Sequence, residues 1–322
     1  MREPLTDLHE DRVGEALGAW GIRPAAFTHL PVGFADHHWS VTDTSGRRWF
    51  ATVADLAHKA YLGPTPAAAR ERLAAAMDTA ARLHDEAGLG FVVAPLRTPE
   101  GRTIRAVGRD RVLSVFPYVE GASGGFGRHA SPYLRGLLLD TLARLHRRTP
   151  PRSAALSPPA IAHRFHLDTV LEEPSRMGAG GPFAEPVAHL LAEHTKRVRA
   201  RLEEYDRRAA ELAGAPVVVT HGEPHPGNVV WRGPNPLLVD WDTVGLAVPE
   251  RDLWLVVEDD ADLERYADAS GHTVDPARLE LYRSRWDLQD VAEFTEAFAR
   301  PHIRDRDTEE AWHALVEIVD RL

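Results

Sequence analysis

The chain has 322 residues, of which 43% are hydrophobic and 27% charged, so a disordered protein is excluded and one large or two modest domains are expected. It contains no cysteine, which excludes disulfides, cysteine-ligated zinc, iron–sulfur clusters and thiol catalysis. The formal net charge of −10 disfavours a nucleic-acid partner, because nucleic-acid binders usually carry a basic surplus.

The first third of the chain is predicted to be β-rich around one long helix. Residues 6–20 carry apolar positions at helical spacing, and the N-terminus shows no apolar signal region. Residues 66–86 are alanine-rich and helical, with Thr65 as N-cap and Pro66 at the first helical position. Strand-like runs separated by turn signals are expected at residues 27–32, 38–42, 48–53, 91–95, 103–107 and 111–116.

The rest of the chain is predicted to be mostly helical. Residues 117–127 contain four glycines and a proline, which is typical of a connector. Helices are expected at residues 132–148, 185–212 and 275–300, with short strands embedded in residues 216–241. No βαβα alternation, GxGxxG after a strand or GxxxxGK[ST] is present, which disfavours a doubly wound sheet and a P-loop.

This order predicts an α+β protein of two lobes. The N-terminal lobe would comprise residues 1–117, an antiparallel sheet with one long helix, and the larger C-terminal lobe residues 118–322, mostly helical. No apolar run is long enough to span a bilayer, so we expect a cytoplasmic protein with no membrane contact and no obligate protein partner.

Polar residues are concentrated in the segment VVVTHGEPHPGNVVWRGPNPLLVDWD and in the PERDLWLV that follows. A carboxylate, a carboxamide and a second carboxylate form an oxygen-rich set that suits Mg²⁺. Zinc bound by His221 and His225 is improbable, because HGEPH is not HExxH and its prolines oppose a helix. The chemistry-bearing residues of this segment are His221, Glu223, Asn228, Asp240, Asp242 and Asp252.

The two motifs HGEPHPGN and LVDWD resemble the catalytic signature of the aminoglycoside phosphotransferase and choline kinase family, within the protein-kinase-like superfamily. The trailing PERDLWLV, the hinge-like SVFPYVEG, the helix LLLDTLARLH and the segment YRSRWDLQDVAEF resemble further parts of this family. The resemblance implies a two-lobed protein-kinase-like fold and a small-molecule kinase that uses Mg²⁺ and ATP, or GTP. Chance loop chemistry is the alternative explanation of the motif pair.

The resemblance also implies roles for individual residues. Asn228 and Asp240 would bind Mg²⁺, and Glu223 would orient the attacking hydroxyl or accept its proton. Three further residues of the segment, His221, Asp242 and Asp252, would support the loop. The nucleotide would be bound by Gly33, Thr52, Pro117, Tyr118 and Val119, although Gly33 could equally be a plain hairpin turn.

Two positions depart from the family pattern. Glu223 stands where the pattern has a catalytic aspartate, and Thr52 stands where it has a phosphate-binding lysine. Lys59 could reach back from a loop, an arginine such as Arg47 or Arg48 could substitute, or Mg²⁺ alone could neutralise the phosphates. A loss of kinase activity is the remaining possibility.

The substrate expected from the resemblance is a cationic, amino-bearing small molecule, first an aminoglycoside or aminocyclitol antibiotic. The alternatives are a metabolite kinase without a resistance role, and an inert kinase-like protein that binds a nucleotide or a partner. Acidic residues that could bind a cationic substrate, or could simply be solvated, are Glu250, Asp259, Asp260, Asp287, Asp290 and Glu293.

Overall fold

The computed structural model describes residues 10–32, 36–125, 127 and 131–322. Internal contacts divide the chain into two compact units. The first comprises Met1–Ser157 and Pro216–Val274, and the second comprises Pro158–Ala215 and Asp275–Leu322. The expected lobe boundary between residues 117 and 118 falls inside the first unit and stays a prediction about how the fold is organised.

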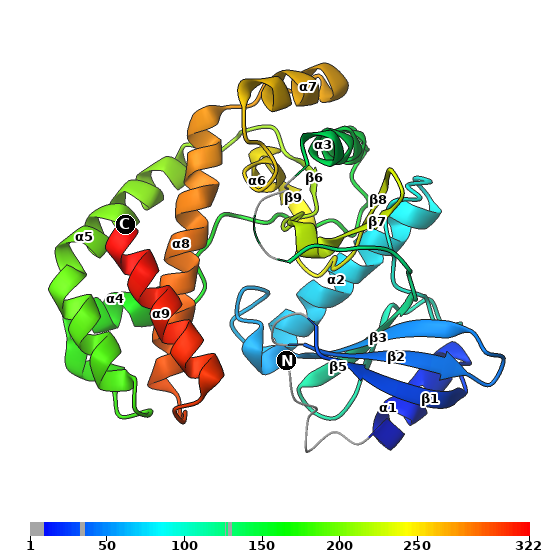
Figure 1. The fold of residues 1–322 in the computed structure, drawn as a ribbon, viewed down its shortest axis with the longest axis horizontal. Coiled ribbons are helices and arrows are strands. Elements are labelled where there is room, and N and C mark those ends of the chain that lie inside the picture. The colour runs from blue at the N-terminus through cyan, green and yellow to red at the C-terminus, as the bar shows by residue number, and fades with distance from the viewer. Residues whose placement is uncertain (1–9, 33–35, 126, 128–130) are drawn as a thin grey trace. The chain divides into compact units, whose positions relative to one another are not determined.

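A five-stranded antiparallel sheet forms the N-terminal part of the first unit, in the order β1-β2-β3-β5-β4 (Figure 1). Alternating and continuous apolar runs place Trp39, Val41, Val53 and Leu113 in its core, together with Leu17 of α1. Asp43 at the end of β2 accepts a hydrogen bond from the Trp49 indole, at 2.9 Å. The elements are α1 (Glu10–Leu17), β1 (Pro24–Leu30), β2 (His37–Asp43), β3 (Arg48–Asp55), β4 (Ile104–Ala106) and β5 (Arg111–Pro117).

The long helix α2 (Pro66–Asp85) follows β3, as predicted. The Thr65 side chain accepts a hydrogen bond from the Ala68 N–H at 3.2 Å, which caps the first turn. Residues 91–95, expected as a strand, form no regular strand. Instead Val92 makes an isolated bridge to Leu238, because this segment meets only the edge of a short hairpin before Pro95.

The remainder of the first unit contains two short antiparallel sheets of two strands each. β6 (Val218–Thr220) pairs with β9 (Gly245–Ala247), and β7 (Val229–Arg232) pairs with β8 (Asn235–Leu238). An isolated bridge from Ala122 to Trp231 joins the connector to β7. The helices of this region are α3 (Pro132–His146), α6 (Glu250–Leu253) and α7 (Asp260–Ser270).

The second unit is helical. Its core is built from α5 and α8 side chains such as Leu191, Val198, Leu288 and Val291, with Leu315 of α9. Its helices are α4 (Arg164–Glu172), α5 (Ala184–Ala210), α8 (Pro276–Ala299) and α9 (Arg306–Arg321). The predicted α+β class is therefore confirmed. None of the helices in the described part of the chain is both long and apolar enough to cross a membrane.

Candidate active site

The loop after β6 begins with His221, which is fully buried. Its Nε2 donates to the Val239 carbonyl at 2.8 Å, and its Nδ1 accepts from the Glu223 N–H at 3.3 Å. The ring also lies edge-on to Trp241, with centroids 4.6 Å apart. Burial lowers the pKa of His221, so the ring stays neutral. The imidazole thus connects the start of one motif to the start of the other.

The buried side chain of Asp252 in α6 binds the backbone of the same loop. It is fully buried and accepts hydrogen bonds from the N–H groups of His221 at 2.8 Å and Gly222 at 2.6 Å. His146 at the end of α3 donates a third bond to it, at 3.0 Å. Burial would raise the pKa of Asp252, but the His146 hydrogen bond and nearby positive charge lower it below its ordinary value. Asp252 is therefore an ionised anchor for the loop.

Glu223, Asn228 and Asp240 are brought together through the backbone. The Asn228 amide nitrogen donates to the Glu223 carbonyl at 3.0 Å, which closes the loop through the short 3₁₀ helix Pro226–Asn228. The Val239 N–H donates to the Asn228 carbonyl at 3.0 Å, directly before Asp240. The two motifs are thus adjacent. Because the side-chain nitrogen of Asn228 makes the hydrogen bond to Glu223, its side-chain oxygen is the atom that could bind a cation.

Asp240 stands in a strained and acidic position. Its φ of 63° lies in the left-handed region, which aspartate tolerates better than most residues. Its side chain is exposed at the surface of the loop. Partial desolvation by the surrounding protein, together with the negative charges of Asp242, Asp36 and Glu223, raises its pKa well above the ordinary value. A carboxylate so placed gains from a neighbouring cation.

Asp242 makes direct contacts that the sequence did not specify. Its Oδ2 lies 2.9 Å from Lys59 Nζ and accepts the Tyr61 hydroxyl at 2.6 Å. Asp36 Oδ2 lies 3.0 Å from the same ammonium. Burial opposes ionisation of Asp242, but Lys59 and Tyr61 outweigh it and lower its pKa. Asp242 is therefore an ionised partner of Lys59 as well as a neighbour of the loop.

The oxygen atoms near Asp240 suit a hard cation such as Mg²⁺ that also binds the phosphates of a nucleotide. The carboxylates of Asp242, Asp36 and Glu223 raise the pKa of Asp240, and the Lys59 ammonium lowers it. In residues 10–32, 36–125, 127 and 131–322, no group of three or more His, Asp or Glu side chains forms a complete metal cage. Mg²⁺ in nucleotide sites needs no such cage, because phosphate and water oxygens supply most of its ligands.

The predicted nucleotide residues have different surroundings. Gly33 lies outside the described residues. Thr52 is buried in β3, and its Oγ1 is hydrogen-bonded to His38 Nδ1 at 3.1 Å. Pro117 ends β5, and the Tyr118 ring carries the Arg48 guanidinium 3.6 Å above its centroid. Val119 packs, together with Leu237 and Val239, against the apolar cluster around Phe116.

The acidic residues named as substrate contacts in the first unit are not equivalent. Glu250 is buried at the start of α6. Asp259 caps α7 by accepting the Asp262 N–H at 3.0 Å, and its Oδ2 lies 3.2 Å from the buried Arg135. Asp260, in the first turn of α7, is exposed. Asp259 and Asp260 are thus both exposed to solvent, and Asp259 differs in that it caps the helix and pairs with Arg135.

The other acidic candidates lie on α8 in the second unit. Glu293 accepts a hydrogen bond from Gln289 at 3.0 Å, and burial raises its pKa. Asp290 is half-buried on the same helix. Asp287 forms an ion pair with Arg321 at 2.6 Å. These contacts assign structural partners to Glu293 and Asp287, and binding roles for the set stay predictions.

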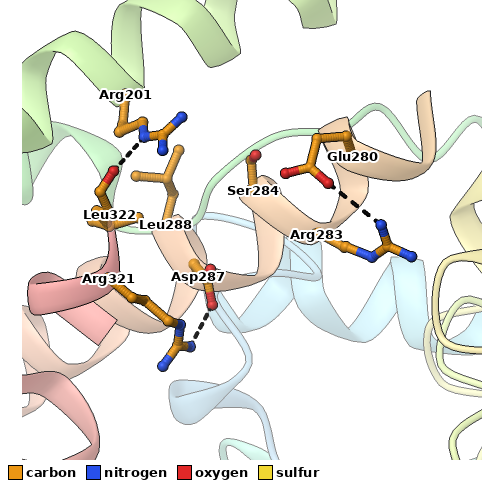
Figure 2. A pocket seen from close by; sticks show the side chains of 8 residues that line it. All are labelled: Arg201, Glu280, Arg283, Ser284, Asp287, Leu288, Arg321 and Leu322. Atoms are coloured by element: carbon orange, nitrogen blue, oxygen red, sulfur yellow. Dashed lines mark hydrogen bonds and ion pairs between the residues drawn. The ribbon is translucent and has the colours of Figure 1, made fainter. Parts of the chain in front are cut away.

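A surface pocket in the second unit contains Asp287 but none of the residues predicted for catalysis, metal binding or nucleotide binding (Figure 2). Its charged side chains are engaged with one another, since Glu280 pairs with Arg283 and Arg201 donates to the Leu322 carbonyl. The same holds for Asp287 and Arg321. The pocket is lined by Arg201, Glu280, Arg283, Ser284, Asp287, Leu288, Arg321 and Leu322.

Sequence reasoning missed Asp36, Tyr61 and His38 as members of the site. Tyr61 and Asp242 are 181 positions apart, and no spacing rule connects them. Asp36 does directly follow the expected turn at residue 33, which is the one local signal that could have marked it.

Comparison with known proteins agrees with this geometry. Residues 27–314 match the model of a family described as the phosphotransferase enzyme family. Protein StrN of Streptomyces griseus is 31% identical over 244 residues, which cover 72% of this chain and 73% of StrN.

Solved structures show the same fold. Spectinomycin phosphotransferase APH(9)-Ia, crystallised with ADP and spectinomycin, has a TM-score of 0.71 at 15% identity, with 98% of each chain covered. The GDP and kanamycin complex of APH(2")-IIia has a TM-score of 0.60 at 14% identity, covering 97% of this chain and 99% of that one. The expected protein-kinase-like fold is thereby confirmed.

Proposed function

This chain belongs to the phosphotransferase enzyme family, and we propose that it transfers the γ-phosphoryl group of ATP, or GTP, to a hydroxyl of an aminoglycoside or aminocyclitol antibiotic. Its family membership makes it a small-molecule phosphotransferase acting on hydroxyl groups. The observation that supports the proposal is a pair of hydrogen bonds, from the Asn228 side chain to the Glu223 carbonyl and from the Val239 N–H, next to Asp240, to the Asn228 carbonyl. Phosphoryl transfer requires this kind of rigid positioning and charge neutralisation more than covalent chemistry.

Asn228 and Asp240 are the proposed metal ligands. The Asn228 side-chain oxygen and the Asp240 carboxylate would hold Mg²⁺, which when bound neutralises the charge of the triphosphate. The raised pKa of Asp240 reflects a local surplus of negative charge, which a divalent cation relieves. Asp252 and His221 keep both ligands in register by fixing the loop and the Val239 carbonyl.

Glu223 is the proposed base. Its carboxylate would accept a hydrogen bond from the substrate hydroxyl, so that the oxygen is aimed at the γ-phosphorus. As the new O–P bond forms and the bond to the leaving ADP oxygen breaks, the hydroxyl proton passes to Glu223. The Glu223 main chain is held at both its N–H and its carbonyl, so the longer side chain projects from a fixed origin.

The base of the nucleotide is proposed to lie against Val119 and its partly buried apolar neighbours Leu237 and Val239. The backbone of Pro117, Tyr118 and Val119 would supply hydrogen bonds to the adenine or guanine edge. Gly33 would allow a close approach to the phosphates, since glycine has no Cβ. Thr52 would contribute its hydroxyl at most, because it carries no charge and already bonds His38.

The proposed substrate class is supported by the net charge of the chain and by the ligands of similar solved structures. The chain has a formal charge of −10, and the similar structures were solved with spectinomycin and kanamycin, both of which carry amino groups. Exposed Asp260 is the first acidic residue to test for contact with such a cation, with Asp290 and Glu293 next.

The test is a phosphotransfer screen with ATP and GTP over spectinomycin, kanamycin, other aminocyclitols and the amino alcohols choline and ethanolamine. Mass spectrometry should detect one added phosphoryl group on an antibiotic, dependent on Mg²⁺ and absent with Asp240→Asn. Transfer to an amino alcohol alone would replace the proposal by a metabolite kinase. Nucleotide binding without transfer to any acceptor would favour an inert kinase-like protein.

A further inference from the structure

Only two lysines occur in the chain, Lys59 and Lys196, and Lys59 is buried to 2% exposure. It follows the short 3₁₀ helix Leu56–His58 after β3. The pairing of His37 with Val53 sets the end of β3 beside the start of β2. The segment carrying Lys59 and the start of β2, which Asp36 directly precedes, therefore lie at the same end of the sheet.

The Lys59 ammonium bridges two parts of the proposed site. It lies 3.0 Å from Asp36, directly before β2, and 2.9 Å from Asp242 in the DWD motif. Tyr61 accepts a further bond from it at 2.8 Å. Burial alone would lower the pKa of Lys59, but the charges of Asp242, Tyr61, Asp36 and Asp240 outweigh burial and raise it well above the ordinary value. The group is therefore a permanent cation.

A buried ion pair is weak evidence for stability, since apolar residues of similar size often stabilise a fold equally well. A functional reason for Lys59 is therefore more persuasive than a structural one. Asp240 belongs to the proposed chemistry, and its negative charge raises the pKa of Lys59, while Lys59 lowers the pKa of Asp240.

The other replacements considered for a strand lysine contact residues other than Asp36, Asp240 and Asp242. Thr52 bonds His38, whose pKa burial lowers to about 3, so this pair is neutral. Arg48 stacks on Tyr118 and pairs with Glu120 at 3.3 Å. Arg47 stacks on Trp49, with its guanidinium carbon 4.1 Å from the ring centroid.

We infer that Lys59 binds the phosphates of the nucleotide and replaces the strand lysine that Thr52 cannot supply, with Asp36, Asp242 and Tyr61 holding its ammonium in place. This inference rests on the proposed function. In the family pattern, a lysine on the third strand binds the phosphates. The inference gives this role to Lys59, which lies seven positions after Thr52 and beyond the end of β3.

Calorimetric titration with adenosine, ADP and ATP in the presence of Mg²⁺ separates phosphate contacts from base contacts. Lys59→Met should weaken ADP and ATP binding about tenfold or more, while adenosine affinity stays within about twofold. Lys59→Arg should recover part of the loss, because it restores the charge. Lys196→Met is the matched control, since Lys196 is exposed on α5 and should leave all three affinities unchanged.

Lys59→Met leaves two buried carboxylates without their cation, so the variant could fold poorly. The double variant Asp36→Asn/Lys59→Met removes one of those charges and leaves Asp242 bonded to Tyr61. It should fold and show a selective loss of ADP binding over adenosine binding that exceeds the loss caused by Asp36→Asn alone. An equal loss for adenosine and ADP, or no loss, would overturn the assignment of Lys59 alone. A wild-type protein that binds no nucleotide would overturn the proposed function with it.

Discussion

Asp240 and Asp242 lie two residues apart, yet their carboxylates have opposite electrostatic surroundings. Asp242 contacts the Lys59 ammonium and the Tyr61 hydroxyl, which lower its pKa. Partial desolvation and the acidic neighbours of Asp240 raise its pKa, although its side chain is exposed. One carboxylate is already satisfied by the protein, and the other is satisfied only when a cation arrives. This difference favours Asp240 over Asp242 as the proposed Mg²⁺ ligand.

Asp240→Asn should therefore separate activity from stability. Asparagine also tolerates the left-handed backbone, and it removes repulsion between acids, so the metal-free protein should melt at an equal or higher temperature. Turnover should fall about 10²-fold or more, because the proposed metal ligand is lost. Asp242→Asn, which breaks the Lys59 pair, should lower the melting temperature. A less stable but active Asp240→Asn protein would place the metal elsewhere.

Glu223→Gln tests the proposed base. Both main-chain hydrogen bonds of Glu223 survive this change, so the loop should keep its shape. We expect kcat to fall about 10²-fold or more, the usual scale for a positioned base, with nucleotide affinity nearly unchanged. Steady-state kinetics and ATP titration measure the two quantities, with exposed Glu100→Gln as the control. Weaker ATP binding with an intact kcat would contradict the role.

At the scale of elements, the loop between β6 and β7 depends on Gly222. Its φ is 107°, and a Cβ there would lie 2.5 Å from Thr243 Oγ1 and from an Arg251 nitrogen. Arg251 bonds Thr220 at 2.7 Å and the Thr243 carbonyl at 2.9 Å, so it cannot easily yield. The approach of α6 to the loop thus requires glycine.

Gly222→Ala should be more destabilising than Gly233→Ala. Both glycines have positive φ, but an added Cβ at Gly233 meets open space. Gly233→Ala should cost about 1 to 2 kcal/mol for the backbone alone, and Gly222→Ala about 1 to 3 kcal/mol more for the displaced neighbours. Urea denaturation of both variants measures the difference. Equal costs would show that the loop can shift to accommodate the side chain.

The elements that the sequence predicted well are those specified by local signals. The helix α2 begins and ends within a residue of its prediction, because Thr65 and Pro66 mark its start. Asn228 and Asp240 were found because a short motif positions them. The wrong strand at residues 91–95 and the undetected Lys59–Asp242 pair depend instead on partners far along the chain, 183 positions in the latter case. Local patterns do not encode such contacts.

At the scale of the whole molecule, stability should respond to pH through groups that act in opposite directions. Burial lowers the pKa of His38 from 6.5 to about 3, and it lowers those of His37 and His221 as well. Burial raises the pKa of Asp36 from 3.8 to about 6. As pH falls below about 6.5, the unfolded chain binds protons at the histidines first, which favours unfolding, whereas Asp36 binds its proton first in the folded state and opposes that trend.

A variant is needed to isolate one histidine from this balance, and His38→Gln does so. Between pH 6.5 and about 3, an unfolded His38 takes up a proton that the folded protein refuses, so the wild type loses stability as pH falls. Glutamine does not titrate. The free energy of unfolding of the variant, relative to wild type, should therefore rise by about 2 kcal/mol or more between pH 7 and pH 4. Urea denaturation at several pH values measures this difference, with exposed His58→Gln as the control substitution. A difference that stays constant with pH would mean that His38 is protonated in the folded protein and that the Thr52–His38 pair carries charge after all.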